Sequence, residues 1–288
     1  MAELRMDWRT RYAAGTPLTS GRDPLGLLYV CCDGLPMPYN RFVDRMQRWW
    51  LGRFYSDLPL SGRSALDVGC GTGRWCRVLR SHGAQVTGAD LSEVVVGHDR
   101  SAPEHGGITF VAAPATALGL PDRSFDLVQA VTVLQHIPPS DQPRAAAEMC
   151  RVARPDGAIL LHEAVGTPEP GDRGVTWPLA PGDWKAMFAT HGWVCVREER
   201  SLFIPLYRLM LAAKALVRRS AGWSAGTEVP PAAASQASRT LTRWFLVLTI
   251  PFFYALEWFV FSVLRGSTWT TGIRSGGTQT FLFRKPSA

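Results

Sequence analysis

The sequence predicts an α/β fold with a doubly wound, mostly parallel sheet. Short apolar runs of strand length alternate with helix-like segments from residue 65 to residue 165. The first apolar run ends in a glycine-rich turn that leads directly into a helix, which is typical of strands joined by right-handed crossover helices. At 288 residues the chain is long enough for one large core with an appendage.

The glycine-rich turn is the most informative motif of the chain. It contains Gly69, Gly71 and Gly73, follows Asp67, and is succeeded by an apolar run that ends on Asp90. Glycines let the backbone approach a ligand, and an acid after the second strand can accept hydrogen bonds from ribose hydroxyls. The motif indicates nucleoside binding, and the alternative is a tight strand-to-helix turn without a ligand.

The spacing of these glycines separates two ligand classes. A dinucleotide fingerprint requires G-x-G-x-x-G, whereas the glycines here alternate and position 74 is arginine. A carboxylate at Asp67 would repel a pyrophosphate and attract an α-ammonium group. In these features the chain resembles the class I S-adenosylmethionine-dependent methyltransferases, whose E/D-x-G-x-G-x-G turn holds the methionine part of the cofactor. The resemblance implies S-adenosylmethionine as cofactor and a seven-stranded, Rossmann-like methyltransferase fold.

The other elements follow in chain order, and the resemblance extends over about residues 39–199 and a final strand. Helices are expected over residues 39–57, from 74, over 142–152 and over 181–191; strands are expected over 65–68 and 85–89, within 109–118 and 124–138, and over 158–165, 192–199 and 278–283. Residues 153–157 match the family's R-P-G-G turn, with aspartate in place of the first glycine.

One segment departs from the family. Many relatives carry an acid after the third strand that accepts a hydrogen bond from the adenine amino group, but residues 109–118 contain none. We therefore expect backbone groups near Ala113 and apolar stacking to hold the adenine. Leu91 and Val131, at the ends of the second and fourth strands, complete the predicted cofactor site.

Candidate catalytic bases follow the fourth and fifth strands, because the binding crevice lies outside the carboxyl ends of the strands. They are His136 and Glu163, with His162 as a third candidate. The ordinary pKa of histidine suits removal of a hydroxyl proton, so we expect O-methylation. The alternative is that His136 is a structural residue at a helix start.

The formal charge of +7 is concentrated in two basic stretches. Residues 41–53 and 208–219 interleave arginines with large apolar side chains, which favours an anionic membrane surface over nucleic acid. The six cysteines lack C-x-x-C spacing, so we expect reduced thiols and no metal site. Residues 1–11 are charged and lack an apolar core, so a cytoplasmic protein is expected, peripheral on the inner face of the membrane.

We expect four parts along the chain. They are an irregular lead-in (1–36), the cofactor-binding core (37–200), a hydrophobic and basic helical insert (201–275) and the final strand (276–288). The insert favours a hydrophobic or lipid-linked small-molecule acceptor, and it lies on a membrane, forms a lid or makes a dimer face. The competing interpretation is a pseudoenzyme that binds cofactor or membrane as an interaction module, and the sequence leaves the oligomeric state open.

Overall fold

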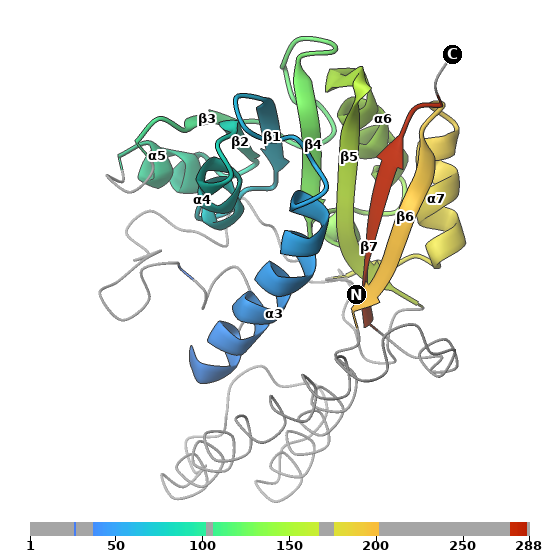
Figure 1. The fold of residues 1–288 in the computed structure, drawn as a ribbon, viewed down its shortest axis with the longest axis horizontal. Coiled ribbons are helices and arrows are strands. Elements are labelled where there is room, and N and C mark those ends of the chain that lie inside the picture. Colours follow the sequence, from blue (N-terminus) through green and yellow to red (C-terminus); the bar gives the residue numbers. More distant parts are fainter. Residues whose placement is uncertain (1–25, 27–36, 102–105, 167–175, 202–276, 287–288) are drawn as a thin grey trace, which may run out of the picture.

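A computed structural model describes residue 26 and residues 37–101, 106–166, 176–201 and 277–286. These residues form a seven-stranded sheet in the order β3-β2-β1-β4-β5-β7-β6 (Figure 1). The strands are β1 (Ser64–Val68), β2 (Gln85–Asp90), β3 (Thr109–Ala112), β4 (Phe125–Val131), β5 (Ala153–Val165), β6 (Val194–Ser201) and β7 (Gly277–Arg284). Strand β7 is antiparallel to both β5 and β6, and the other pairs are parallel. The predicted fold class is confirmed.

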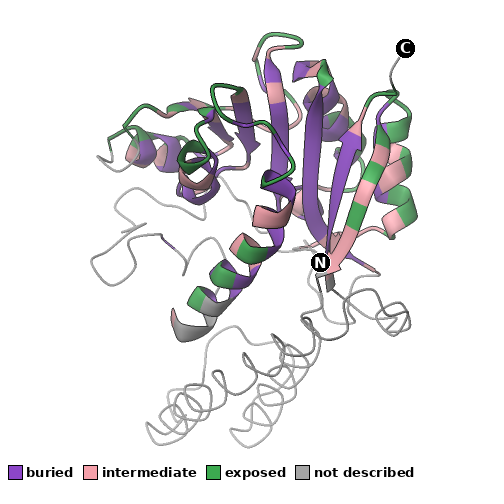
Figure 2. Cartoon of the chain, in the orientation of Figure 1, coloured by how far each residue is buried: buried purple, intermediate pink, exposed green. Residues whose placement is uncertain are grey.

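Helices cover both faces of the sheet. They are α3 (Met37–Tyr55), α4 (Arg74–Ser81), α5 (Glu93–Ser101), the short 3-10 helix η2 (Leu134–His136), α6 (Gln142–Val152) and α7 (Pro181–Ala189). Figure 2 shows that the central strands β4 and β5 are buried along most of their length. Strands that are covered on both faces have near-continuous apolar sequences, which explains the unbroken apolar runs of this chain.

Helix α3 packs on the sheet through Leu51 and Phe54, which are fully buried. Near the middle of the helix, Asp44 accepts a hydrogen bond from Arg74 of α4 at 3.0 Å within a buried ion pair. Arg74, the residue that excluded a dinucleotide motif, therefore joins the first helix of the core to α3. Trp49 of the same helix, by contrast, is 39% exposed.

The R-P-D-G segment is a bulge within β5 rather than a break before it. Ala153 pairs with Phe125 of β4, whereas Ala158 pairs with Leu127, so residues 154–157 lie opposite a single residue of β4. A Cβ on Gly157 would lie 2.7 Å from the backbone oxygen of Asp126, so a side chain at this position would collide with β4. Strand β5 consequently begins five residues earlier than the sequence predicts.

Strand β6 ends, and strand β7 begins, at the edge of the sheet that carries the carboxyl ends of the parallel strands. Ser201, at the end of β6, pairs with Thr278, and Gly277, at the start of β7, pairs with Val165 at the end of β5. The predicted insert (201–275) and lead-in (1–36) lie outside the described residues, apart from Ser201 and Gly26. Within the described ranges, no helix is long and apolar enough to cross a membrane.

Candidate active site

The carboxyl ends of four neighbouring strands bring the predicted cofactor residues together. Val68 of β1 lies between Ala89 of β2 and Ala130 of β4, and Asp90 pairs with Ala112 of β3. The residues that follow these positions therefore share one edge of the sheet. They are Gly69, Leu91, Ala113 and Val131, with Asp90 among them.

The glycine turn has a backbone that only glycine adopts easily. Gly69, Gly71 and Gly73 have φ angles of +68°, +53° and +67°. A Cβ on Gly69 would lie 2.5 Å from Cγ2 of Val133, so the turn packs directly against the segment after β4. The Gly71 N–H donates to Oδ2 of Asp90 at 2.9 Å, which ties the turn to the end of β2.

Asp90 organises the second side of the site. Its Oδ1 accepts a hydrogen bond from the Ser92 N–H at 2.9 Å, and its backbone oxygen accepts one from the Ala113 N–H at 2.8 Å. Burial raises the pKa of Asp90, while the N–H donors of Ser92, Gly71 and Leu91 oppose that rise. The side chain is partly exposed, and its carboxylate has further lone pairs for ribose hydroxyls.

Asp67 points into a buried polar network rather than toward solvent, and it is 1% exposed. Its Oδ1 accepts from Gln129 Nε2 at 2.9 Å and its Oδ2 from Cys76 Sγ at 3.4 Å; Tyr55 in turn donates to Gln129 Oε1 at 2.7 Å. Burial raises the pKa of Asp67 to about 6, and the Gln129 and Cys76 hydrogen bonds limit the rise. The predicted contact with an α-ammonium group stays a prediction.

The chain leaves β4 through a strained residue that the sequence did not single out. Thr132 has a φ of +56°, which is rare for a β-branched side chain. Its N–H donates to the backbone oxygen of His162 at 2.7 Å, and its hydroxyl donates to the oxygen of Val131. Such strain gathers at functional sites, where surrounding contacts enforce it.

Glu163 accepts three backbone hydrogen bonds from the turn after β4. Its Oε1 accepts from the N–H groups of Val133 and Leu134, both at 2.9 Å, and its Oε2 accepts from Gln135 at 3.2 Å. The side chain is 0% exposed. Burial raises the pKa of Glu163 to about 7, against the opposing effect of these three N–H donors.

His136 lies at the end of η2 and is partly exposed. The Ala164 N–H donates to Gln135 Oε1 at 2.7 Å, so the amide nitrogen of Gln135 faces Nε2 of His136, at 3.3 Å. An amide N–H that points at this atom favours the neutral ring with a lone pair on Nε2 and the proton on Nδ1.

His162 occupies a different place, inside the sheet. It is 1% exposed, and its Nδ1 lies 2.8 Å from the hydroxyl of Thr280 on β7. Burial lowers the pKa of His162 to about 3, with a smaller contribution from the Arg74 charge. It is therefore a neutral core residue near pH 7. In the described part of the chain, no three His, Cys, Asp or Glu side chains gather as metal ligands would.

Comparison with known proteins agrees with this geometry. Residues 66–161 match the family described as "Methyltransferase domain". A ubiquinone biosynthesis O-methyltransferase of Methylococcus capsulatus is 35% identical over 141 residues, covering 42% of this chain and 59% of that protein. A demethylmenaquinone methyltransferase of Shouchella clausii is 40% identical over 109 residues, covering 36% and 46%. The chain thus spans about half the length of these relatives.

The structure resembles the [4+2]-cyclase SpnF with a TM-score of 0.54, over 89% of this chain and 85% of that one. At 22% identity this likeness shows the fold alone. The matched segment contains the glycine turn, Asp90 and the turn after β4. Residues 66–161 therefore match a methyltransferase domain, and this part of the chain resembles the class I S-adenosylmethionine-dependent methyltransferases.

Proposed function

We propose that the protein methylates an oxygen atom of a hydrophobic or lipid-linked small molecule, with S-adenosylmethionine as methyl donor. One observation carries the proposal: the glycine turn packs against the turn that bears His136, and Asp90 joins the glycine turn to the end of β2. A cofactor site and a candidate base thus lie at the same edge of the sheet. The ubiquinone and demethylmenaquinone methyltransferases among the relatives support a hydrophobic acceptor.

The residues present fit S-adenosylmethionine. Three glycines with positive φ angles allow close approach of the methionine part, and Asp90 offers acceptors for the ribose. Ala113 does not offer its N–H to the adenine, because that group already donates to Asp90. We expect apolar contacts from Leu91 and Val131 to hold the adenine instead. When bound, the cofactor supplies an electrophilic methyl group on a sulfonium sulfur.

His136 is our proposed base. Its side chain is partly exposed, and imidazole is the side chain that most often removes a proton in general base catalysis. Glu163 is fully buried, and both its oxygens accept backbone hydrogen bonds. These contacts favour His136 over Glu163. The protein's remaining task is to align the acceptor with the methyl group and to exclude water.

The composition of residues 202–276 supports the same class of acceptor. The segment contains the apolar stretch 244–264 and the basic stretch 208–219. Strand β6 ends, and strand β7 begins, at the edge of the sheet that carries the candidate site. We propose that this segment brings the protein to an anionic membrane surface, where lipid-linked acceptors reside. The expected result is sedimentation with anionic vesicles at low salt, and lack of sedimentation contradicts the membrane proposal.

The test of the catalytic proposal has two steps. Calorimetry with S-adenosylmethionine measures cofactor binding, with Gly71→Val as a variant in which backbone approach is blocked. Labelled cofactor is then incubated with fractionated lipid extracts to find a methylated product. Product formation that Gly71→Val and His136→Ala both abolish supports the proposal, with His136→Ala retaining cofactor affinity. A wild-type protein that does not bind the cofactor overturns it.

A pseudoenzyme is the second candidate, and a specific observation favours it. The segment after β3 offers the adenine neither an acid nor the N–H of Ala113. Cofactor binding without turnover across many acceptors would support a binding module in place of an enzyme.

A further inference from the structure

Glu163 has a contact pattern that suits an anchor better than a proton acceptor. Three backbone N–H groups, of Val133, Leu134 and Gln135, converge on its two oxygens. Three donors need an acceptor-only partner, which a carboxylate is and a glutamine is not. Because β5 is a central strand of the sheet, the anchor itself is rigid.

The anchored turn contacts the cofactor site through Val133. The methyl groups of this side chain lie where a Cβ of Gly69 would be, so the backbone of the glycine turn rests directly on Val133. Thr132, immediately before it, is held at a φ of +56°. A strained residue relaxes when its neighbours are released, so the hydrogen bonds of Glu163 oppose that relaxation.

We propose that Glu163 is a positioning residue for the cofactor site, which it shapes by fixing the turn 132–135 and, through Val133, the glycine turn at Gly69. The proposal rests on the proposed function, because it concerns the binding of S-adenosylmethionine. It assigns Glu163 no contact with cofactor or acceptor. Its effect on the reaction passes through the backbone.

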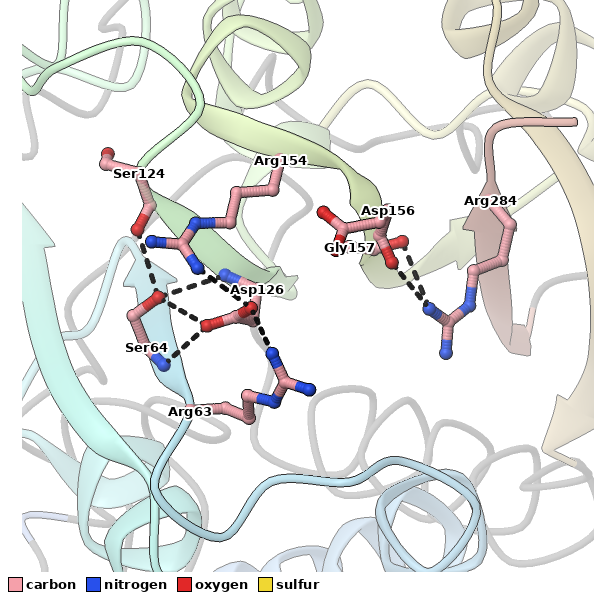
Figure 3. A network of polar contacts seen from close by, with 8 residues as sticks. All are labelled: Arg63, Ser64, Ser124, Asp126, Arg154, Asp156, Gly157 and Arg284. Atoms are coloured by element: carbon pink, nitrogen blue, oxygen red, sulfur yellow. Dashed lines mark hydrogen bonds and ion pairs between the residues drawn. The ribbon is translucent and has the colours of Figure 1, made fainter. Parts of the chain in front are cut away.

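Asp126 provides a matched control at the opposite edge of the same sheet. It also accepts a backbone N–H, from Ser64 at 2.9 Å, and it belongs to a polar network with Arg63 and Arg154 (Figure 3). Its loss removes a carboxylate anchor from the sheet without touching the turn 132–135. A loss of stability can thereby be separated from a loss of cofactor affinity.

The experiment compares Glu163→Gln and Glu163→Ala with Asp126→Asn and Asp126→Ala in the full chain. Calorimetry with S-adenosylmethionine at pH 8 and thermal unfolding are measured for each. Glu163→Gln keeps one acceptor oxygen and should weaken binding about tenfold, the equivalent of one hydrogen bond to a charged group. Glu163→Ala should weaken binding further, and the Asp126 variants should bind as the wild type does.

A double-mutant cycle with Val133→Ala tests the route of the effect. Val133→Ala keeps the backbone hydrogen bonds to Glu163 but removes the methyl groups beside Gly69, so its effect and that of Glu163→Gln should not add. Unchanged cofactor affinity in both Glu163 variants overturns the inference but not the proposed function. The same holds if the Glu163 and Asp126 variants lose cofactor affinity in the same proportion to their loss of melting temperature. Wild-type protein that fails to bind the cofactor overturns the proposed function, and the inference with it.

Discussion

The pKa values of carboxylates are shifted in opposite directions at the two edges of the sheet. At the carboxyl edge, Asp67, Asp90 and Glu163 are held mainly by N–H and thiol donors, and burial raises the pKa of all three. At the amino edge, burial also acts to raise the pKa of Asp126, but hydrogen bonds from Ser64 and the charges of Arg154 and Arg63 outweigh it and lower that pKa. Figure 3 shows the second arrangement.

The difference follows from the partners of each carboxylate, which are hydrogen-bond donors inside the protein at one edge and arginines near the surface at the other. A buried carboxylate with a raised pKa costs folding free energy, whereas one paired with arginines at the surface does not. The strained backbone of Thr132 and the positive φ angles of the glycine turn lie at the same carboxyl edge. Strain and buried carboxylates therefore coincide where the predicted cofactor residues meet.

The largest effect is expected at Gly69. In Gly69→Ala the new Cβ collides with Val133 and the residue is forced to a φ near +68°. We expect a loss of about 2–4 kcal/mol in the free energy of unfolding and at least about a hundredfold loss of affinity for S-adenosylmethionine, which corresponds to about 3 kcal/mol. Denaturant unfolding and calorimetry measure the two effects.

Gly62 is the control for Gly69, because it has a φ of +72° but no atom within 4 Å of the position that a Cβ would take. Gly62→Ala should cost only about 1 kcal/mol and leave cofactor affinity unchanged. Equal effects of the two substitutions would show that backbone conformation alone matters and that the contact with Val133 does not.

The pH dependence of stability should have opposite signs at the two edges. Between pH 4.5 and about 7 the folded chain keeps a proton on Glu163 that the unfolded chain releases, and Asp67 behaves likewise between pH 3.8 and about 6. The free energy of unfolding should therefore fall as the pH rises through these windows, by at most about 3 kcal/mol for each group. Asp126, with its lowered pKa, contributes stability that is lost as the pH falls below its ordinary value of 3.8.

Denaturant unfolding from pH 4 to pH 8 measures this dependence. A Glu163→Gln, Asp67→Asn double variant should flatten the decline toward neutral pH, whereas Asp126→Asn should leave it in place. A decline of the same size in the double variant assigns the effect to other groups.

Asp67→Asn should have a moderate effect, and it should stabilise the protein rather than destabilise it. The asparagine oxygen can still accept from Gln129, and the buried charge is gone, so we expect the free energy of unfolding at pH 8 to rise by about 1–2 kcal/mol. If Asp67 also attracts the α-ammonium group, cofactor affinity falls about tenfold in the same variant. Unchanged affinity for S-adenosylmethionine would show that Asp67 takes part in the buried hydrogen-bond network and not in cofactor binding.

The smallest effects are expected at the arginines of the amino edge. Arg63 and Arg154 are 51% and 43% exposed, so their ion pairs with Asp126 are screened by solvent. Arg63→Gln and Arg154→Gln should each cost less than about 1 kcal/mol. Chemical unfolding at low and high salt checks this, since the cost should shrink as salt is added. A larger, salt-independent loss would remove the contrast between the edges.

The local pattern of apolar residues was sufficient to predict most helices and strands. Helix α6 was predicted with the bounds that it has, because its apolar stripe repeats at helical spacing, and the second strand was predicted to within one residue. The start of β5 was predicted wrongly. Pro155 and Gly157 ordinarily end regular structure, but here the pairing of Ala153 with Phe125 continues the strand across a bulge.

The sequence by itself determined the fold class, the glycine turn and the set of residues at the carboxyl edge, because these depend on periodicity and on spacing along the chain. Only the tertiary structure decided how those residues are used. Glu163 accepts three N–H groups from a turn about 30 residues away, and Gly69 is required by the methyl groups of Val133. Such contacts arise when separate strands are brought side by side, so no local pattern encodes them.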